Sequence, residues 1–280
     1  MHATDPLTFS LARESTSEAI RLFRAGCHEP ALHLLRKAES CLPSFTPALA
    51  WQVPVLDALG RADEVAEFYD FRNSVMMFDL NCELAAASCS LSDAMAAWIR
   101  GQVKFKSGSA RMPLVQAKVS GELATSCDPL LAEFQRRVMN CFSQYLAQAR
   151  FRNPHIARME DCWSSIWATR TSRQGRIGAH YHPRSWLTSV FYPTSQCRSA
   201  RSSNECGGDL ELGHLPSYMA ALKTPHVFRV APQSGRLIIF PAYLGHAVTP
   251  VTCAAARISI ATDLCILEKR FGAEFASNVE

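Results

Sequence analysis

The chain lacks any uninterrupted apolar run close to the roughly 18 residues that a membrane-spanning helix requires, so the sequence predicts no transmembrane segment. It also lacks a C-x-x-C pair among its 11 cysteines. Its first residues do not combine a basic start with an apolar core, as a secretion signal does. We therefore expect a cytoplasmic protein whose cysteines are reduced and mostly buried, without a disulfide framework.

A strong excess of one charge sign is also missing. Lysine and arginine number 29 against 25 aspartate and glutamate residues, which gives a formal net charge of +4. So small and scattered an excess favours neither a nucleic-acid partner nor a membrane surface. The hydrophobic share of 48% and the charged share of 19% are typical of a soluble globular protein. A length of 280 residues favours two domains of unequal size.

The first 70 residues carry a helical pattern that repeats. Gly26 and Gly60 lie 34 positions apart, and apolar residues recur at matching offsets from each. A period of this length resembles the tetratricopeptide repeat. Pro30 would lie in the first turn of a helix, where its missing N–H costs nothing. Pro54 falls inside a predicted helix and argues against the repeat, which leaves two unrelated helical hairpins as the alternative.

A helix-like pattern continues over residues 76–100, and a polar stretch over 104–111 precedes a change of periodicity. We therefore predict a helical repeat-like domain over 1–105 and a second domain over 106–280. Two repeat units bury too little apolar surface to be stable alone, so the helices should pack on the second domain or self-associate as a homodimer.

The second domain is predicted to contain one helix followed by a sheet. The helix should span residues 128–149, with Asp128 as its N-cap and Pro129 as its first residue. The stretch 194–208, rich in serine and arginine, is expected to be a mobile surface loop. Strand-like runs separated by Gly, Pro and Ser clusters occupy residues 163–170, 185–192, 208–213, 226–232, 235–244 and 256–264.

The fold class follows from the order of these elements. No long helical pattern separates the strand-like runs, so the sheet should be antiparallel, as in a jelly roll or barrel. The sequence thus predicts an α+β protein, with an N-terminal tetratricopeptide-like helical segment followed by a double-stranded β-helix (jelly-roll) domain.

Three of the nine histidines stand out by their positions. His180 and His182 form an H-x-H pair at the expected start of a strand, where the period of two places both on one face. His246 directly follows the apolar run 235–244, and strands distant in sequence can be neighbours in a jelly roll. Imidazoles on facing strands are suitable ligands for iron, zinc or copper. Hydrogen-bonded histidines at strand ends, with no metal, are the alternative.

Arg257 and Ser259 lie in the last predicted strand. An arginine that projects from an apolar strand into a barrel is costly unless it meets an anion. Its guanidinium matches a carboxylate with two parallel hydrogen bonds, and a nearby serine hydroxyl adds a further donor. A dicarboxylate that chelates a metal at one end and meets Arg257 at the other accounts for both features, as in a 2-oxoglutarate site.

These motifs resemble the 2-oxoglutarate/Fe(II)-dependent oxygenases, in the subgroup that carries H-x-H-P-x-S. Residues 180–185 read HYHPRS, and residues 208–212 read GDLEL. Residues 232–250 match P-x-x-G-x-L-x-x-F-P-x-x-L-x-H-x-V-x-P, and residues 257–260 read RISI. The four blocks follow one another in the order typical of the family, and the resemblance extends over about residues 160–263.

The resemblance implies an enzyme, a dioxygenase that uses Fe(II), 2-oxoglutarate and O2 and releases succinate and CO2 as it hydroxylates its substrate. It implies that His180, His182 and His246 are the metal ligands, with no catalytic residue beyond the metal and cosubstrate ligands. The expected substrate is a peptide, a protein or a small molecule, because helical repeats commonly offer a peptide-binding surface.

The same resemblance implies that the far carboxylate of 2-oxoglutarate binds Arg257 and Ser259. Tyr192 lies in the inward phase of its strand and is expected to donate its phenol to the cosubstrate, with a role as a core aromatic as the alternative.

The chain departs from the wider superfamily at one ligand, because most of these oxygenases use two histidines and one carboxylate. His182 stands where the carboxylate is expected. In one interpretation His182 is the third protein ligand. In another it only orients the site, and a water molecule completes a metal site with two histidines. In a third, Asp209 or Glu211 on the next strand supplies the missing oxygen.

Two other classes of protein remain as alternatives. A cupin-type metal protein without 2-oxoglutarate also uses H-x-H and a distal histidine. It usually adds a glutamate three or four residues after the second histidine, whereas residues 185–187 here are Ser-Trp-Leu. A catalytically inactive interaction protein is the second alternative, although His180, His246 and Arg257 are all present.

Overall fold

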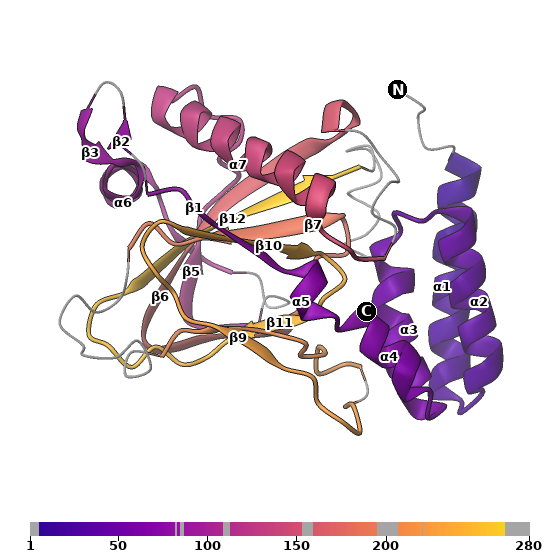
Figure 1. Cartoon of the computed structure of the whole chain (residues 1–280). Coiled ribbons are helices and arrows are strands. Elements are labelled where there is room, and N and C mark those ends of the chain that lie inside the picture. Colours follow the sequence, from indigo (N-terminus) through magenta and orange to yellow (C-terminus); the bar gives the residue numbers. More distant parts are fainter. Residues whose placement is uncertain are drawn as a thin grey trace.

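The computed structural model describes residues 6–81, 83–84, 87–108, 113–152, 159–194, 207–219 and 221–266. Helices form the N-terminal part of this structure, and a curled antiparallel sheet follows (Figure 1). Within these ranges every helix is too short or too polar to cross a lipid bilayer. The predicted α+β class, helices followed by a jelly roll, is therefore confirmed.

Two helical hairpins open the chain, and Figure 1 shows them side by side at one end of the barrel. In both hairpins the first helix ends in the same way. Gly26 has φ 80° and Gly60 has φ 73°, so both adopt the left-handed conformation that glycine favours. The residue after each glycine donates its N–H to a carbonyl five positions back, Leu22 and Leu56 respectively. The hairpins are formed by α1 (Pro6–Arg24), α2 (His28–Cys41), α3 (Thr46–Ala58) and α4 (Ala62–Phe68).

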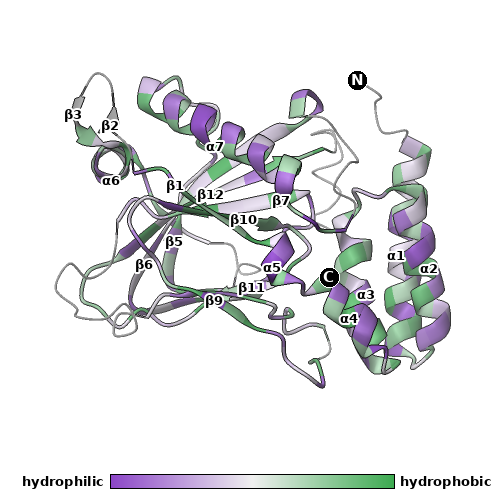
Figure 2. Cartoon of the chain, in the orientation of Figure 1, coloured by the Kyte–Doolittle hydropathy of each residue, from purple (hydrophilic) through white to green (hydrophobic). Residues whose placement is uncertain are grey.

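The helices pack on the barrel and share a hydrophobic core with it. Helix α3 is buried along nearly its whole length, despite the interior Pro54, and it is correspondingly apolar in Figure 2. The Phe68 ring meets Tyr243 of the barrel edge-on, with 5.6 Å between ring centroids. Packing on the second domain is thus the alternative that the structure shows, whereas self-association stays a prediction.

The helix-like interpretation of residues 76–100 is only half right. Short helix α5 (Phe71–Ser74) leads into strand β1 (Met76–Asp79), which pairs antiparallel with β10 in the barrel sheet. Its residues alternate between half-buried and exposed, a period of two that fits an edge strand. The sheet therefore includes a strand from within residues 1–105. A β2–β3 pair (Glu83–Leu84 and Ala87–Ser90) precedes α6 (Leu91–Gln102), where the helical expectation holds.

Helix α7 (Pro129–Gln148) confirms the expected position and cap. The Asp128 carboxylate accepts the N–H of Leu130 at 2.9 Å, which satisfies one of the free donors of the first turn. Across one face of the sheet (Figure 1), α7 packs its apolar side on the strands, and the Phe134 ring lies 5.2 Å from that of Phe191. This layer covers the outer face of the barrel and leaves the inner face for the polar residues described below.

In the part of the chain that the structure describes, ten strands form one sheet. All six predicted strand runs contain an observed strand, although residues 195–206 of the expected 194–208 loop lie outside the described residues. The strands besides β1 are β4 (Lys106–Ser107), β5 (Leu114–Val119), β6 (Trp163–His180), β7 (Leu187–Phe191), β8 (Leu210–Leu212), β9 (Phe228–Val230), β10 (Arg236–Pro241), β11 (His246–Val248) and β12 (Arg257–Cys265).

Strand β6 links the two halves of the barrel. Its first part pairs with β12, from Cys265 opposite Trp163 to Arg257 opposite Thr171. Its last part pairs instead with β11, which continues to β8 and β9. One long strand therefore carries the chain from the Arg257 end of β12 to His246 on β11, and this places the two groups of predicted site residues in one interior.

The expectation of reduced, mostly buried cysteines is only partly right, because seven cysteines of the described residues are free but most of these are not buried. Cys253 is disulfide-bonded. Among the free cysteines of the described residues, Cys27, Cys41 and Cys127 are exposed, whereas Cys141 and Cys265 are buried. The exposed thiols lie at helix ends or in loops, where the chain meets solvent whatever the apolar character of the side chain.

Candidate metal centre and cosubstrate pocket

The H-x-H pair lies at the end of β6, not at the start of a strand as expected. His180 is the last residue of β6 and is paired with His246, the first residue of β11. The register shifts between this pair and the Val248–Ile177 pair, which bends the strand end. His182 lies two residues beyond the strand, where its backbone N–H donates to Ala242 at 3.1 Å. The bend and this anchor allow three imidazoles to meet.

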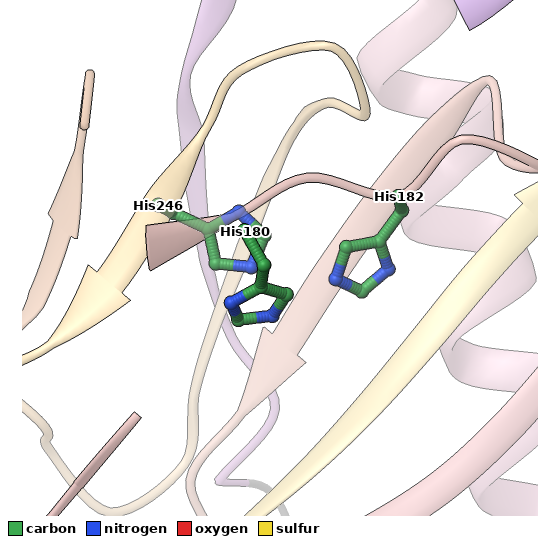
Figure 3. A group of neighbouring side chains, drawn as sticks. All are labelled: His180, His182 and His246. Carbon is green, nitrogen blue, oxygen red and sulfur yellow. The ribbon is translucent and has the colours of Figure 1, made fainter. Parts of the chain in front are cut away.

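The three predicted histidines form one cluster. Each offers a ring nitrogen, and the three nitrogens lie within 4.8 Å of one another. The ring centroid of His246 is 4.3 Å from that of His180 and 5.0 Å from that of His182. Figure 3 shows the rings gathered between the end of β6 and the start of β11. His182 and His246 are buried and His180 is half-buried, so the cluster is largely shielded from solvent.

Backbone carbonyls fix the proton positions of two of these rings. The Nδ1 of His180 donates to the Gly178 carbonyl at 2.9 Å, and the Nδ1 of His246 donates to Leu244 at 3.1 Å. A carbonyl can only accept, so each Nδ1 carries the hydrogen and each Nε2 keeps a free lone pair. This tautomer is the one in which Nε2 is ready to bind a metal ion.

The third ring is held by a carboxylate that the sequence did not predict for the site. The Nδ1 of His182 lies 2.8 and 2.9 Å from the two oxygens of Asp263, which is buried on β12. A signal for this residue existed in the sequence. Positions 257, 259 and 263 have the same parity in one strand, so Asp263 faces inward with Arg257 and Ser259.

Burial also favours the neutral imidazoles of His180 and His246. It lowers the pKa of His180 to about 4, and the neighbouring His182 adds to the effect. The pKa of His246 falls well below its ordinary value, first through burial and then through the other two histidines. Neutral imidazole is the form that binds a metal, and three convergent imidazoles suit a borderline divalent ion such as Fe(II). The donor set therefore fits the implied iron.

Neither carboxylate from the third interpretation joins the cluster. Glu211 lies opposite Ala247 rather than His246, so its side chain points to the other face of β8. There it accepts from Arg229 and lies 3.0 Å from the Nε2 of His214. Asp209 is buried apart from the three histidines, and burial raises its pKa against the opposing charges of Arg229 and Arg257. The structure thus brings His182, and neither acid, to the cluster.

The predicted cosubstrate residues form a second group inside the barrel. Arg257 is 1% exposed, and it donates to the Ser259 hydroxyl at 3.2 Å and to the Tyr192 hydroxyl at 3.0 Å. Its guanidinium carbon also lies 4.9 Å from the centre of the Tyr192 ring. Tyr192 is fully buried, so it is a core aromatic that also contacts the guanidinium.

Donors near Arg257 are left unsatisfied. The Nε of Arg257 has no hydrogen-bond partner, and neither has the hydroxyl of Thr171 on the paired strand. Among the described residues, no carboxylate lies within ion-pair distance of the guanidinium. A buried cation without a carboxylate in direct contact is costly, and a buried unpaired donor costs about 1–3 kcal/mol. The group therefore fits an anionic ligand such as the far carboxylate of 2-oxoglutarate.

A cleft of about 650 Å³ opens beside the histidine cluster. It reaches His180, His182 and Asp263, and its walls include Trp163 and Trp167 of β6. The Trp167 ring stacks on His182, with centroids 5.6 Å apart and planes 24° apart. An aromatic wall next to the histidine cluster excludes water and presents a flat apolar surface to a ligand.

The fold and the site define a jelly-roll protein with a three-histidine cluster of metal-binding geometry and a buried arginine whose Nε has no hydrogen-bond partner. Residues 165–263 match the family model described as "Putative 2OG-Fe(II) oxygenase". This segment contains the three histidines and Arg257, so the similarity to the 2OG-Fe(II) oxygenases covers the whole candidate site. The match relates this segment to enzymes that use Fe(II) and 2-oxoglutarate.

Several solved structures are similar to the chain in fold. A prolyl-4-hydroxylase of Pseudomonas putida is 13% identical, with a TM-score of 0.47, over 71% of this chain and 97% of its own. A prolyl hydroxylase of Trichoplax adhaerens in complex with a hypoxia inducible factor peptide fragment is 15% identical, with a TM-score of 0.47, over 77% and 92%. HygX of Streptomyces hygroscopicus, with nickel and 2-oxoglutarate bound, is 10% identical, with a TM-score of 0.42, over 71% and 86%. A comparison with curated protein sequences gave no match.

Proposed function

We propose that His180, His182 and His246 together hold the Fe(II) ion of this oxygenase. The supporting observation is the tautomer set by the three Nδ1 contacts, which leaves a free Nε2 on every ring. A histidine that served only the fold would not need its second nitrogen left free next to two others. Three protein ligands leave coordination positions open for a cosubstrate, as in other catalytic iron sites.

The cosubstrate is proposed to bind between this cluster and Arg257. Arg257 and Ser259 would hold the far carboxylate of 2-oxoglutarate, and the Tyr192 hydroxyl, which accepts from Arg257, keeps its own proton for donation. When bound, Fe(II) and 2-oxoglutarate together activate O2, and 2-oxoglutarate is converted to succinate and CO2 as the substrate is oxidised. The chain itself supplies the ligands, the fixed proton positions and the buried anion pocket.

The substrate is proposed to be a peptide, a protein side chain or a small molecule that enters the cleft beside His180. Apolar walls from Trp163 and Ile177 would position a C–H bond near the metal. Exposed charges of both signs line the same cleft, with Lys106 and Arg184 against Glu122. A substrate with an apolar group to insert and polar groups around it matches this lining.

An anaerobic titration tests the proposal. Fe(II) added to the full-length protein in the presence of 2-oxoglutarate should give a visible metal-to-ligand charge-transfer band, and Fe(II) alone should not. Succinate formed on admission of air gives the uncoupled activity, and candidate peptides should raise it above that baseline. Absence of both the band and succinate would overturn the assignment of the histidines and Arg257.

A further inference from the structure

Asp263 is a buried carboxylate, 7% exposed, and no Lys or Arg of the described residues forms an ion pair with it. Instead it is surrounded by hydrogen-bond donors. The Ser185 hydroxyl donates to its Oδ2 at 2.5 Å, the Thr188 hydroxyl donates to its Oδ1, and the His182 Nδ1–H spans both oxygens. All three groups donate to the one carboxylate, whose two oxygens offer enough lone pairs to accept from each of them.

Neighbouring residues hold the side chains of His182 and Asp263 in place. Strand β12 places Asp263 opposite Thr188 on β7, which fixes the carboxylate between the two strands. On its other side, His182 is stacked on Trp167. The loop that carries Ser185 is itself held, because the Thr46 hydroxyl at the start of α3 donates to the Ser185 carbonyl. The helical segment thus helps to hold the Asp263 carboxylate, because Thr46 positions the residue whose hydroxyl donates to it.

The His182–Asp263 pair matters for the charge that the protein presents to a bound metal ion. A face of two histidines and one carboxylate contributes one negative charge directly to a divalent ion. Three neutral imidazoles contribute none, so the ion would keep its full charge in a buried site, at a high desolvation cost. Asp263 brings the missing charge one hydrogen bond away from the metal position, behind the ring that replaces the carboxylate.

We propose that Asp263 is a positioning residue that supplies, through His182, the negative charge which a carboxylate ligand provides in a two-histidine, one-carboxylate site. This inference rests on the proposed metal function of the three histidines. The carboxylate orients the His182 ring so that its Nε2 faces the other two, and it makes that nitrogen a stronger donor to a cation.

Asp263→Asn separates the charge from the hydrogen bonds. The amide oxygen can still accept from His182, and the Ser185 and Thr188 hydroxyls can rotate to accept from the amide nitrogen. The affinity of the metal-free, full-length protein for Co(II), followed anaerobically by the cobalt absorption bands, should fall by about 10–100-fold. Glu39→Gln is the matched control, because Glu39 is a largely buried carboxylate that binds Arg152 and Gln52 in the helical segment. It should leave the Co(II) affinity unchanged.

Measuring Asp263→Asn in a second variant, His182→Asp, distinguishes an effect of charge from an effect on structure. His182→Asp places a carboxylate at the ligand position, next to the carboxylate of Asp263. Two adjacent buried carboxylates repel each other, so adding Asp263→Asn to His182→Asp should increase the Co(II) affinity. The same substitution would thus weaken metal binding in the wild-type background and strengthen it in the His182→Asp background. A purely structural role of Asp263 predicts loss in both.

The outcomes distinguish this inference from the proposed function. Loss of Co(II) binding in His180→Ala, together with unchanged affinity in Asp263→Asn, would overturn the role of Asp263 and leave the metal site intact. A lower affinity in both backgrounds would overturn it as well. If the wild-type protein binds neither Co(II) nor Fe(II), the proposed function fails and the inference fails with it. Where His182→Asp does not fold by its thermal melting curve, the single Asp263→Asn comparison with Glu39→Gln decides.

Discussion

The two ends of strand β12 carry buried charged residues of opposite sign, which differ in how fully their hydrogen bonds are satisfied. At one end the Asp263 carboxylate is fully engaged by donors from three residues. At the other end the Arg257 guanidinium has an Nε without a partner and lies beside the unpaired hydroxyl of Thr171. A charge that the fold satisfies supports its neighbours, whereas a charge that the fold leaves unsatisfied is suited to a ligand.

The largest expected effect lies at the three-histidine cluster. His180→Ala and His246→Ala should each abolish Fe(II) binding, because two remaining protein ligands are too few to hold a labile ion. His182→Ala should weaken binding strongly if the third ring is a ligand. Equilibrium dialysis with Fe(II) under argon measures all three. Wild-type iron affinity in His182→Ala would leave the two-histidine site with a water ligand as the correct interpretation.

The next effect concerns the unsatisfied end of β12. Arg257→Ala should raise the apparent constant for 2-oxoglutarate by roughly 30-fold to several thousand-fold, since truncating a buried charged partner costs about 2–5 kcal/mol. Metal affinity should stay nearly unchanged, which separates this end from Asp263. Arg257→Lys should restore only part of the loss, because an ammonium cannot form the paired hydrogen bonds of a guanidinium. Succinate formation against 2-oxoglutarate concentration gives the constant, and an unaltered constant in Arg257→Ala would contradict the assignment.

Acid should destabilise the metal-free protein through the histidine cluster. The ordinary pKa of histidine is near 6.5, whereas burial lowers that of His180 to about 4 in the folded protein. Between these values the unfolded chain binds a proton that the folded protein does not, so the free energy of unfolding should fall as the pH falls. Urea unfolding at pH 7 and pH 5 measures the change. His180→Ala should show a shallower dependence, and an equal slope in both proteins would contradict this origin.

The smallest expected effect concerns Thr171, and it tests whether the space around Arg257 binds a ligand or is only part of the protein core. Thr171 carries a buried hydroxyl without a partner, so Thr171→Val removes an unsatisfied group without changing the shape of the side chain. The melting temperature of the metal-free protein should rise slightly, since the desolvation cost of the hydroxyl disappears. The 2-oxoglutarate affinity should fall by a few-fold if that hydroxyl meets the cosubstrate. A lower melting temperature would show that the hydroxyl has a partner in the folded protein.

Local patterns in the sequence were sufficient for most of the scaffold. The Asp128–Pro129 pair predicted the start of α7, and the glycines at 26 and 60 predicted equivalent hairpin turns, since both signals act within a few residues. The strand runs were also readable, because alternation and bounding turn residues are local. Strand β1 was missed, since its conformation depends on pairing with β10, far away in the sequence.

The sequence by itself singled out the three histidines, Arg257 and Ser259 as candidates, because an H-x-H pair places two imidazoles on one face and a buried arginine is costly without an anion. Only the tertiary structure decided which group completes the histidine cluster. The bend at the end of β6, the pairing of β12 with β7 and the loop held by α3 bring His182 to Asp263, while Glu211 faces away on β8. Contacts between residues 81 positions apart depend on strand register and on packing, and no local pattern encodes either.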